Sequence, residues 1–325
     1  MEREKRVHPR LIRPLILSIL VAIAIYGLSV ISTDFEAIGE LSSKFGWSVW
    51  LLVLGLSLSN YLLRFVRWQL YINRFSDAVP TLTNLTYYLA GFAFTTTPGK
   101  AGEAVRSLYL KRHGVAYADS LAAFFTERFI DVITMVLLSL SAAVAFPDFR
   151  WPVILVAALF VGSLPLIRSM KMHHLLDRLR LQLPSKKIRS VGEHLLALLR
   201  SAADLLKTRL LYSGLALGLL AWGSEGVAFY IILDTLGVSS PFWVAVGIYS
   251  ISMLVGALSF IPGGLGSTEA VMVLLLTLIG ADMPTAIAAT LICRVTTLWF
   301  AVIIGAISMT ILELQDRERR KQAIL

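Results

Sequence analysis

Two short stretches, PGKAGE at 98–103 and PGGLGSTE at 262–269, interrupt the long apolar segments of this chain and set its architecture. Each stretch follows one apolar run and precedes another. Proline removes a backbone donor and glycine permits tight turns, so a helix does not continue through either stretch. We therefore expect two helical hairpins. The residues expected to form their turns are Pro98, Gly99 and Gly102 in the first hairpin and Pro262, Gly263, Gly264 and Gly266 in the second.

The charges around the two stretches repeat as well. Each stretch ends in a glutamate, Glu103 or Glu269, and an arginine follows 25 residues later in the next long apolar run, Arg128 or Arg294. A proline-glycine pair is common, but two such motifs with the same charge spacing are not. The chain is therefore expected to contain an internal duplication.

Composition places the chain in a membrane. Of its 325 residues, 57% are hydrophobic and 16% are charged, and the mean hydropathy is +0.74. An average soluble domain has about 25% charged residues. This composition excludes a disordered chain, a disulfide scaffold and an ordinary cytosolic enzyme, and the one cysteine, Cys293, cannot form an intrachain disulfide. The apolar runs are long enough to cross a hydrocarbon core of about 30 Å and lack the alternation of a β-barrel. We expect an all-α, polytopic helical membrane protein.

We interpret residues 1–325 as a single integral membrane domain. The basic N-terminus precedes a retained first helix, which is peripheral to the duplication. The expected full spans are 11–31, 46–72, 118–146, 152–167, 208–234 and 284–313. The expected parts after the first helix are repeat 1 (46–146), a linking span (152–167), a basic amphipathic segment (168–207), repeat 2 (208–313) and a tail (314–325).

The distribution of Lys and Arg predicts the orientation. With the N-terminus in the cytoplasm, 23 of the 30 fall on the inner side and only Lys44 and Arg150 on the outer side. This asymmetry predicts a multi-pass protein of the cell membrane with both termini in the cytoplasm. The segment 168–207 would lie on the anionic inner leaflet as amphipathic helices. It has no nucleic-acid-binding motif, so we expect no nucleic-acid partner.

This orientation turns the duplication into an inverted repeat. The first unit enters from outside and the second from the cytoplasm, so the two broken hairpins would be re-entrant from opposite sides. Inverted repeats whose discontinuous helices meet near the midplane recur in transporters. Two half-sites related in this way can exchange inward-open and outward-open shapes at similar energy.

Several charged residues fall inside the apolar runs, where each costs about 2.5–3.5 kcal/mol on insertion scales. Such residues by default line a polar path and are paired. The candidates for binding an anionic substrate are Lys100, Arg106, Arg128, Arg294, Arg64 and Arg67. The candidates for gating or charge pairing are Glu103, Glu269, Glu127, Asp131 and Glu225.

The basic candidates have alternative roles. Lys100 follows the first turn, where free N–H groups at a helix start would favour a phosphate; alternatively, it snorkels to the cytoplasmic surface. Arg64 and Arg67 lie beside Trp68 and Tyr71. They either snorkel within an aromatic belt or meet lipid headgroups.

The acidic candidates have alternatives too. Glu127 and Asp131 lie on one helix face and either carry protons or a cation, or neutralise nearby arginines. Glu103 and Glu269 can complement the dipoles of their half-helices, or the repeated pairs can be structural salt bridges. Glu225 has no evident partner, and its simplest role is a neutral hydrogen bond to the backbone of a neighbouring helix.

The sequence shows no nucleophile elbow, phosphate loop, dinucleotide fingerprint or zinc motif, so we expect no enzyme activity, metal or cofactor. A free-standing membrane enzyme is the weakest hypothesis. Its best acid–base candidates would be Glu127 and Asp131.

Three segments carry a resemblance to a known family: TTTPGKAGEAVR at 95–106, ERFID at 127–131 and FIPGGLGSTE at 260–269. They resemble the lysylphosphatidylglycerol synthase transmembrane-region family, and the resemblance covers about 15–313. This flippase-like domain is also attached to some archaeal dolichyl-phosphate glycosyltransferases. In bifunctional members, a similar domain flips the aminoacylated lipid that a cytosolic synthase domain makes. The present sequence ends at Leu325 with no synthase domain, so we do not expect lysyl transfer.

Two functional hypotheses follow. The first is a lipid translocase that moves an anionic lipid, of phospholipid or polyprenyl-phosphate type, between leaflets. The second is a membrane partner that does not transport but presents lipid to a separate glycosyltransferase or lipid-modifying enzyme. The sequence leaves the oligomeric state open.

Overall fold

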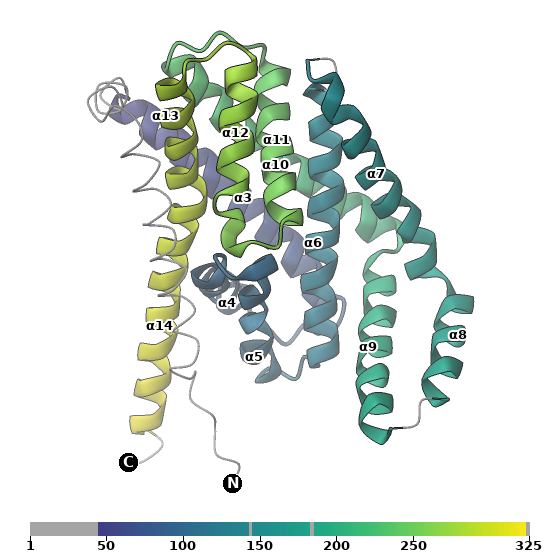
Figure 1. Ribbon diagram of the computed structural model, residues 1–325. Helices are drawn as coiled ribbons and strands as arrows, with labels where there is room; N and C mark the ends of the chain where they lie inside the picture. The colour runs from purple at the N-terminus through teal and green to yellow at the C-terminus, as the bar shows by residue number, and fades with distance from the viewer. Residues whose placement is uncertain (1–44, 143–144, 183–184, 323–325) are drawn as a thin grey trace.

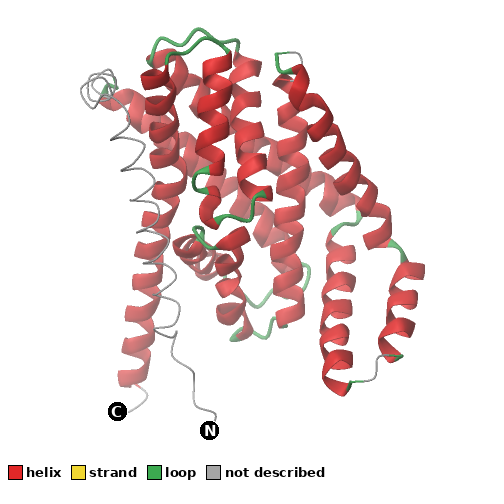
Figure 2. Ribbon diagram, viewed as in Figure 1, coloured by secondary structure: helices red, strands yellow, loops and turns green. Residues whose placement is uncertain are grey.

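The computed structural model describes residues 45–142, 145–182 and 185–322, and within these ranges every regular element is a helix (Figure 2). The expected first helix at 11–31 lies outside the described residues. Four helical segments are long and apolar enough to cross a membrane: Trp47–Asn73, Pro147–Arg168, Thr208–Thr235 and Met283–Asp316. The chain is an all-α, polytopic helical membrane protein.

The first unit begins with α3 (Trp47–Asn73) and ends with α6 (Tyr117–Ser139) and a 3₁₀ turn, η3 (Leu140–Ala142). Between them lies the first hairpin. Its elements are α4 (Thr81–Gly91), η1 (Phe92–Phe94), η2 (Pro98–Val105) and α5 (Arg106–Lys111). The apolar run expected as one half-helix is therefore shorter, because the chain tightens into 3₁₀ turns before Pro98.

Three helices connect the units. The linking span is α7 (Pro147–Arg168), which Figure 1 shows at the edge of the bundle. The basic segment forms an antiparallel pair, α8 (Met170–Leu181) and α9 (Lys186–Leu205), and α9 packs against α6. The Ser169 side chain accepts a 3.3 Å hydrogen bond from the Met172 amide and so caps the start of α8.

The second unit begins with α10 (Thr208–Thr235) and contains the second hairpin, α11 (Phe242–Leu258), η4 (Pro262–Gly264) and α12 (Ser267–Leu278). Its last part is one continuous helical segment, which we call the rod. The rod consists of α13 (Met283–Arg294), a π-helical turn η5 (Val295–Trp299) and α14 (Phe300–Gln322). The expected tail at 314–325 therefore continues this helix as far as Gln322.

The two hairpins point toward each other and their turns touch in the middle of the bundle. In Figure 1, α4 and α5 lie below this contact and α11 and α12 above it. A side-chain carbon on Gly99 would lie 3.5 Å from the Phe260 ring, and one on Gly263 would lie 3.4 Å from the Cα of Thr96. The inverted repeat and the re-entrant course of both hairpins stay predictions.

Close backbone packing holds the bundle together at glycines. Gly218 on α10 faces Arg67 and Thr134, and a side-chain carbon there would lie 2.6 Å from the Thr134 hydroxyl. Gly305 on α14 lies against the backbone of η1 at Phe92, with no room for a side chain. Glycine is therefore needed at both positions for helices to approach this closely.

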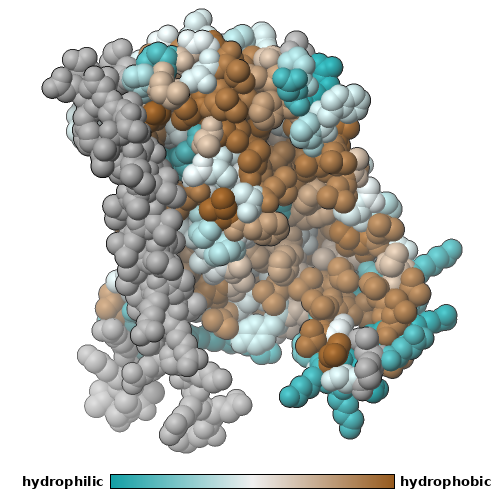
Figure 3. Space-filling model, viewed as in Figure 1, coloured by the Kyte–Doolittle hydropathy of each residue, from teal (hydrophilic) through white to brown (hydrophobic). Residues whose placement is uncertain are grey.

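Much of the visible face of the molecule is apolar, as Figure 3 shows, and hydrophilic side chains gather at the end where α8 and α9 lie. Large hydrophobic side chains on the long helices are exposed, among them Leu51, Leu155 and Leu220. A soluble monomer rarely exposes so much apolar surface in one region, whereas a bilayer solvates it. Helix α6 is long enough to cross as well, but its central charges Glu127, Arg128 and Asp131 face the interior or its margin.

Candidate functional site

The turn of the first hairpin is built around Thr97. Its hydroxyl accepts a 2.7 Å hydrogen bond from the Gly102 amide, and its carbonyl accepts one of 2.9 Å from the Lys100 amide. Gly99 and Lys100 both have positive φ, 57° and 56°. Gly102 lies so close to Phe94 that a side-chain carbon would be 2.6 Å away, which explains the glycine. The sequence predicts unsatisfied N–H groups at the start of this half-helix. That expectation is wrong for the Lys100 and Gly102 amides, because both donate to Thr97.

Eight charged side chains converge near this turn, and we call them the inner cluster. They are Arg64, Arg67, Lys100, Glu103, Arg106, Glu127, Arg128 and Asp131. Arg67 Nη2 lies 2.6 Å from Asp131 Oδ1 and 3.8 Å from Glu127 Oε1. Arg106 Nη1 lies 3.2 Å from Glu127 Oε2. Glu127 and Asp131 therefore both lie beside arginines, as the charge-pairing interpretation expects.

Glu103 joins the hairpin to this cluster. Its Oε2 lies 3.1 Å from Arg106 Nη2 and 3.9 Å from Arg128 Nη2, and Thr95 donates a 3.0 Å hydrogen bond to its Oε1. The Arg106 guanidinium in turn stacks over the Trp68 ring at 4.2 Å. Buried charges that are paired and stacked in this way are stabilised by their neighbours rather than by solvent.

Two members of the inner cluster are poorly paired. Arg64 is only 4% exposed, yet its Nε and Nη2 atoms have no hydrogen-bond partner among the described residues, and Asp131 Oδ2 lies 4.0 Å away. Lys100 has no ion pair within the described part of the chain, and its Nζ lies 5.7 Å from the Trp222 ring centre. The snorkelling interpretation of Arg64 and Arg67 is wrong, because both side chains turn into the bundle.

The second hairpin has its own arginine. Arg294 Nε donates a 2.7 Å hydrogen bond to Glu269 Oε1, and its Nη2 donates one of 2.6 Å to the Gly263 carbonyl in the turn. Glu269 Oε2 also accepts a 2.7 Å hydrogen bond from the Gly266 amide at the start of α12. Glu269 thus contacts Arg294, as the repeated spacing predicts, and lies in the first turn of α12, where a negative charge complements the helix dipole.

Glu225 lies apart from these pairs. It is 3% exposed, and its Oε2 accepts a hydrogen bond from the Tyr249 hydroxyl on α11. The expected hydrogen bond to backbone is wrong, since the partner is a side chain that was not considered from the sequence.

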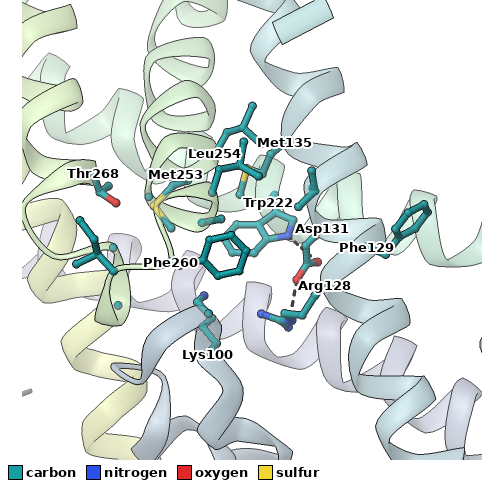
Figure 4. Close-up of a pocket in the computed structure, with 18 of the residues that line it drawn as sticks. Lys100, Arg128, Phe129, Asp131, Met135, Trp222, Met253, Leu254, Phe260 and Thr268 are labelled. Carbon is teal, nitrogen blue, oxygen red and sulfur yellow. Dashed lines mark hydrogen bonds and ion pairs between the residues drawn. The ribbon is translucent and has the colours of Figure 1, made fainter. Parts of the chain in front are cut away.

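A cavity of about 410 Å³ lies between α6 and the second hairpin, and Lys100, Arg128 and Trp222 form part of its wall (Figure 4). Trp222 donates a 2.9 Å hydrogen bond to Asp131, and Arg128 Nη2 lies 3.1 Å from the same carboxylate. The rest of the lining is mostly apolar. Exposed apolar side chains at its margin are Phe125, Leu258, Phe260 and Ile261. The cavity therefore opens on an apolar surface.

A second, smaller chamber of about 40 Å³ lies between the turns of the two hairpins. It shares Lys100, Trp222, Met253 and Gly263 with the large cavity, so these residues separate the two spaces. Its other charged residues are Arg64, Glu103, Glu225 and Arg294. Charged side chains from around both hairpin turns thus meet at one small space.

Sequence reasoning missed several polar residues of the site: Thr95, Thr97, Trp222 and Tyr249. The segment WGSEG at 222–226 was a usable signal, since a tryptophan and a glutamate interrupt an apolar helix there. Across the described ranges, no group of three or more His, Cys, Asp or Glu side chains is arranged to hold a metal ion.

Comparison with known proteins places this arrangement in a family. The sequence matches the family described as lysylphosphatidylglycerol synthase TM region over residues 15–305. It is 27% identical over 239 residues to a UPF0104 membrane protein of Methanothermobacter thermautotrophicus, covering 66% of this chain and 70% of the relative. It is 24% identical over 269 residues to the UPF0104 membrane protein PH1989 of Pyrococcus horikoshii, covering 74% and 80%. The chain belongs to the lysylphosphatidylglycerol synthase transmembrane-region family.

Proposed function

We propose that this chain is a lipid translocase, which moves an anionic lipid of phospholipid or polyprenyl-phosphate type between the leaflets of the cell membrane. Both termini would face the cytoplasm. The observation that carries the proposal is the large cavity, which combines an apolar margin with two cations, Lys100 and Arg128, in its inner wall. A lipid with an anionic headgroup has the same two-part chemistry.

The charge of the inner cluster supports an anionic headgroup. Five cationic side chains meet three carboxylates, which leaves an excess of two positive charges. Buried cations are normally paired, because an uncompensated charge in a low-dielectric interior is costly. In the described part of the chain, Arg64 has two nitrogens without a hydrogen-bond partner and the Lys100 ammonium has no ion pair, so both are suited to a phosphate that enters from outside the protein.

The size and margin of the cavity support a lipid rather than a small soluble anion. At about 410 Å³ it falls within the usual range of ligand pockets, about 300–1,000 Å³. The exposed rings of Phe125 and Phe260 flank its opening. Acyl or prenyl chains can remain in the bilayer against this margin while the headgroup reaches the cations.

The test uses purified protein in phosphatidylcholine vesicles that contain acyl-labelled fluorescent phosphatidylglycerol. Dithionite, which quenches only the outer leaflet, measures how fast labelled lipid leaves the inner leaflet. We expect exchange with the wild type and a loss of about tenfold or more in Arg64→Gln, Arg128→Ala and Arg294→Ala, because each removes a charge-assisted contact or its support. Arg178→Gln, an exposed site on α8, is the matched control and keeps the wild-type rate.

Labelled polyprenyl phosphate in parallel vesicles separates the two lipid classes. If the wild type and every variant exchange both lipids no faster than vesicles without protein, the translocase proposal is contradicted. The buried charges would then be structural pairs, and the role of a membrane partner that presents lipid to a glycosyltransferase or other lipid-modifying enzyme would take its place.

A further inference from the structure

Glu225 is a buried carboxyl that the ion pairs of this protein leave out. Glu103, Glu127 and Asp131 each have an arginine nitrogen within 3.2 Å. Within the described residues, no lysine or arginine nitrogen lies within 4.0 Å of Glu225, whose hydrogen-bond partner is the Tyr249 hydroxyl. Its environment thus differs in kind from that of the other three carboxyls.

This environment allows two protonation states. An ionised carboxylate that is buried without an adjacent cation carries a desolvation cost, and a neutral carboxyl does not. A tyrosine hydroxyl can donate to either form, so the bond from Tyr249 to Oε2 survives protonation. The proton itself would then sit on Oε1, the oxygen that Tyr249 does not bind.

Glu225 lines the small chamber between the hairpin turns together with the cations Arg64, Lys100 and Arg294. A water molecule needs about 10–15 Å³ of such space, so about 40 Å³ holds a few waters that can deliver a proton. The titratable groups that face Glu225 from the neighbouring elements are Tyr61 and Arg64 on α3, Lys100 and Glu103 on η2, Tyr249 on α11, and Cys293 and Arg294 on α13.

We propose that Glu225 is a proton-binding site coupled to the lipid headgroup. The carboxyl is ionised while the chamber is free of lipid phosphate, and it takes up one proton when an anionic headgroup approaches Arg64 and Lys100. This inference rests on the proposed function and adds a proton as the second transported species.

Charge balance is the physical reason. The carboxylate and the headgroup compete for the same cations, and two negative charges at short range in a buried site repel strongly. One proton from chamber water adds to Oε1 as the phosphate enters and returns to water as it leaves. The proton therefore crosses in the same direction as the lipid, and a proton gradient drives lipid movement.

Thermodynamic linkage between proton binding and headgroup binding predicts how strongly the lipid affinity depends on pH. If headgroup binding takes up one proton, the affinity rises about tenfold for each unit by which pH falls, over the range in which Glu225 of the lipid-free protein is ionised. Glu225→Gln is a permanent mimic of the neutral form. It should bind anionic lipid at every pH as the wild type does at low pH.

The first measurement is infrared difference spectroscopy of the full-length protein in vesicles, which detects the carbonyl band of a protonated buried carboxyl as pH changes. We expect the band in the wild type and in Asp234→Asn, which alters an exposed carboxylate on the same helix. We expect Glu225→Gln to lack it. Vesicles of phosphatidylglycerol should hold the band to a higher pH than vesicles of phosphatidylcholine.

Two results would overturn the proposal: a band that persists unchanged in Glu225→Gln, or a wild-type band that titrates alike in both lipids. The exchange assay separates this outcome from failure of the proposed function. A wild type that exchanges lipid without any pH dependence is a translocase without this coupling. A wild type that exchanges neither labelled lipid contradicts the translocase itself.

Discussion

Arg294 Nε lies 2.7 Å from Glu269 Oε1, while Arg128 Nη2 and Glu103 Oε2, from the pair with the same spacing after the first turn, are 3.9 Å apart. The same spacing of 25 residues thus produces two different contacts. Arg106 accounts for the difference, because it binds Glu103 at 3.1 Å. The second hairpin is held by its own arginine, whereas the first shares its glutamate within the inner cluster.

Glu269 should matter for stability in two separable ways. Glu269→Ala removes both the partner of Arg294 and the acceptor for the Gly266 amide, and we expect a loss of about 3–5 kcal/mol. Glu269→Gln keeps one acceptor oxygen and replaces the other by an amide nitrogen, which cannot accept, so it should cost less than Glu269→Ala. Thermal unfolding in detergent measures both. Equal losses in the two variants would contradict this order, because the remaining acceptor oxygen of glutamine would then contribute nothing to the stability of the hairpin.

Two neighbouring arginines on α3 should behave differently. Arg67→Gln breaks a 2.6 Å buried pair with Asp131 and should destabilise the protein by about 3–5 kcal/mol. Arg64→Gln should cost about 1 kcal/mol or less, because removing a poorly paired buried charge offsets lost packing. Unfolding curves recorded beside lipid-exchange rates test this contrast. A large stability loss in Arg64→Gln would make Arg64 a structural residue.

Gly305 should not tolerate even a methyl group. A side-chain carbon there meets the η1 backbone, so Gly305→Ala must push α14 and η1 apart, at a cost of about 1–3 kcal/mol. Gly162→Ala on α7 is the control, since no atom of the described residues outside its own helix turn lies within 4 Å of the added carbon. It should leave stability equal or slightly higher, because alanine favours helix. Comparable melting temperatures for the two variants would contradict the packing described here.

Asp204, at the end of α9, should make stability depend on pH. Partial burial alone would raise the pKa of Asp204, but hydrogen bonds and charges from Lys207 and Arg74 together hold that pKa below its usual value. A lowered folded-state pKa means that the contribution is present above the usual Asp range, about 3.9, and disappears as pH falls through the folded value.

The corresponding variant is Asp204→Asn. The difference in melting temperature between wild type and this variant should be constant from neutral to mildly acidic pH and then shrink. The size should be modest, about 0–1 kcal/mol, because these side chains are partly exposed. A difference that grows on acidification would reverse the assigned sign.

The broad architecture followed from sequence because apolar length and proline-glycine breaks are local signals. Pro98 and Pro262 marked the turns, and the repeated Glu269–Arg294 spacing predicted a contact that the structure contains. Hydropathy also distinguished the long membrane-spanning helices from the segments that connect them. These features depend on neighbours in the chain, which a sequence displays directly.

The details of the site depended on long-range contacts that periodicity does not reveal. Whether Arg64 snorkels or turns inward is decided by α10, which brings Trp222 to 5.1 Å from its guanidinium. Tyr249 reaches Glu225 from a different helix, 24 residues away. The charge of each side chain was evident from sequence, but its partner was not.

The contact of Gly305 with the η1 backbone also has a consequence for biosynthesis. Residues 92–94 leave the ribosome some 200 residues before α14, which completes their packing. Arg112 and Asp316, 2.9 Å apart, join the same two parts of the chain. Contacts between such distant segments form late, because the intervening chain must first be made and placed. The packing of the first hairpin is therefore completed only after the last helix has been translated and inserted.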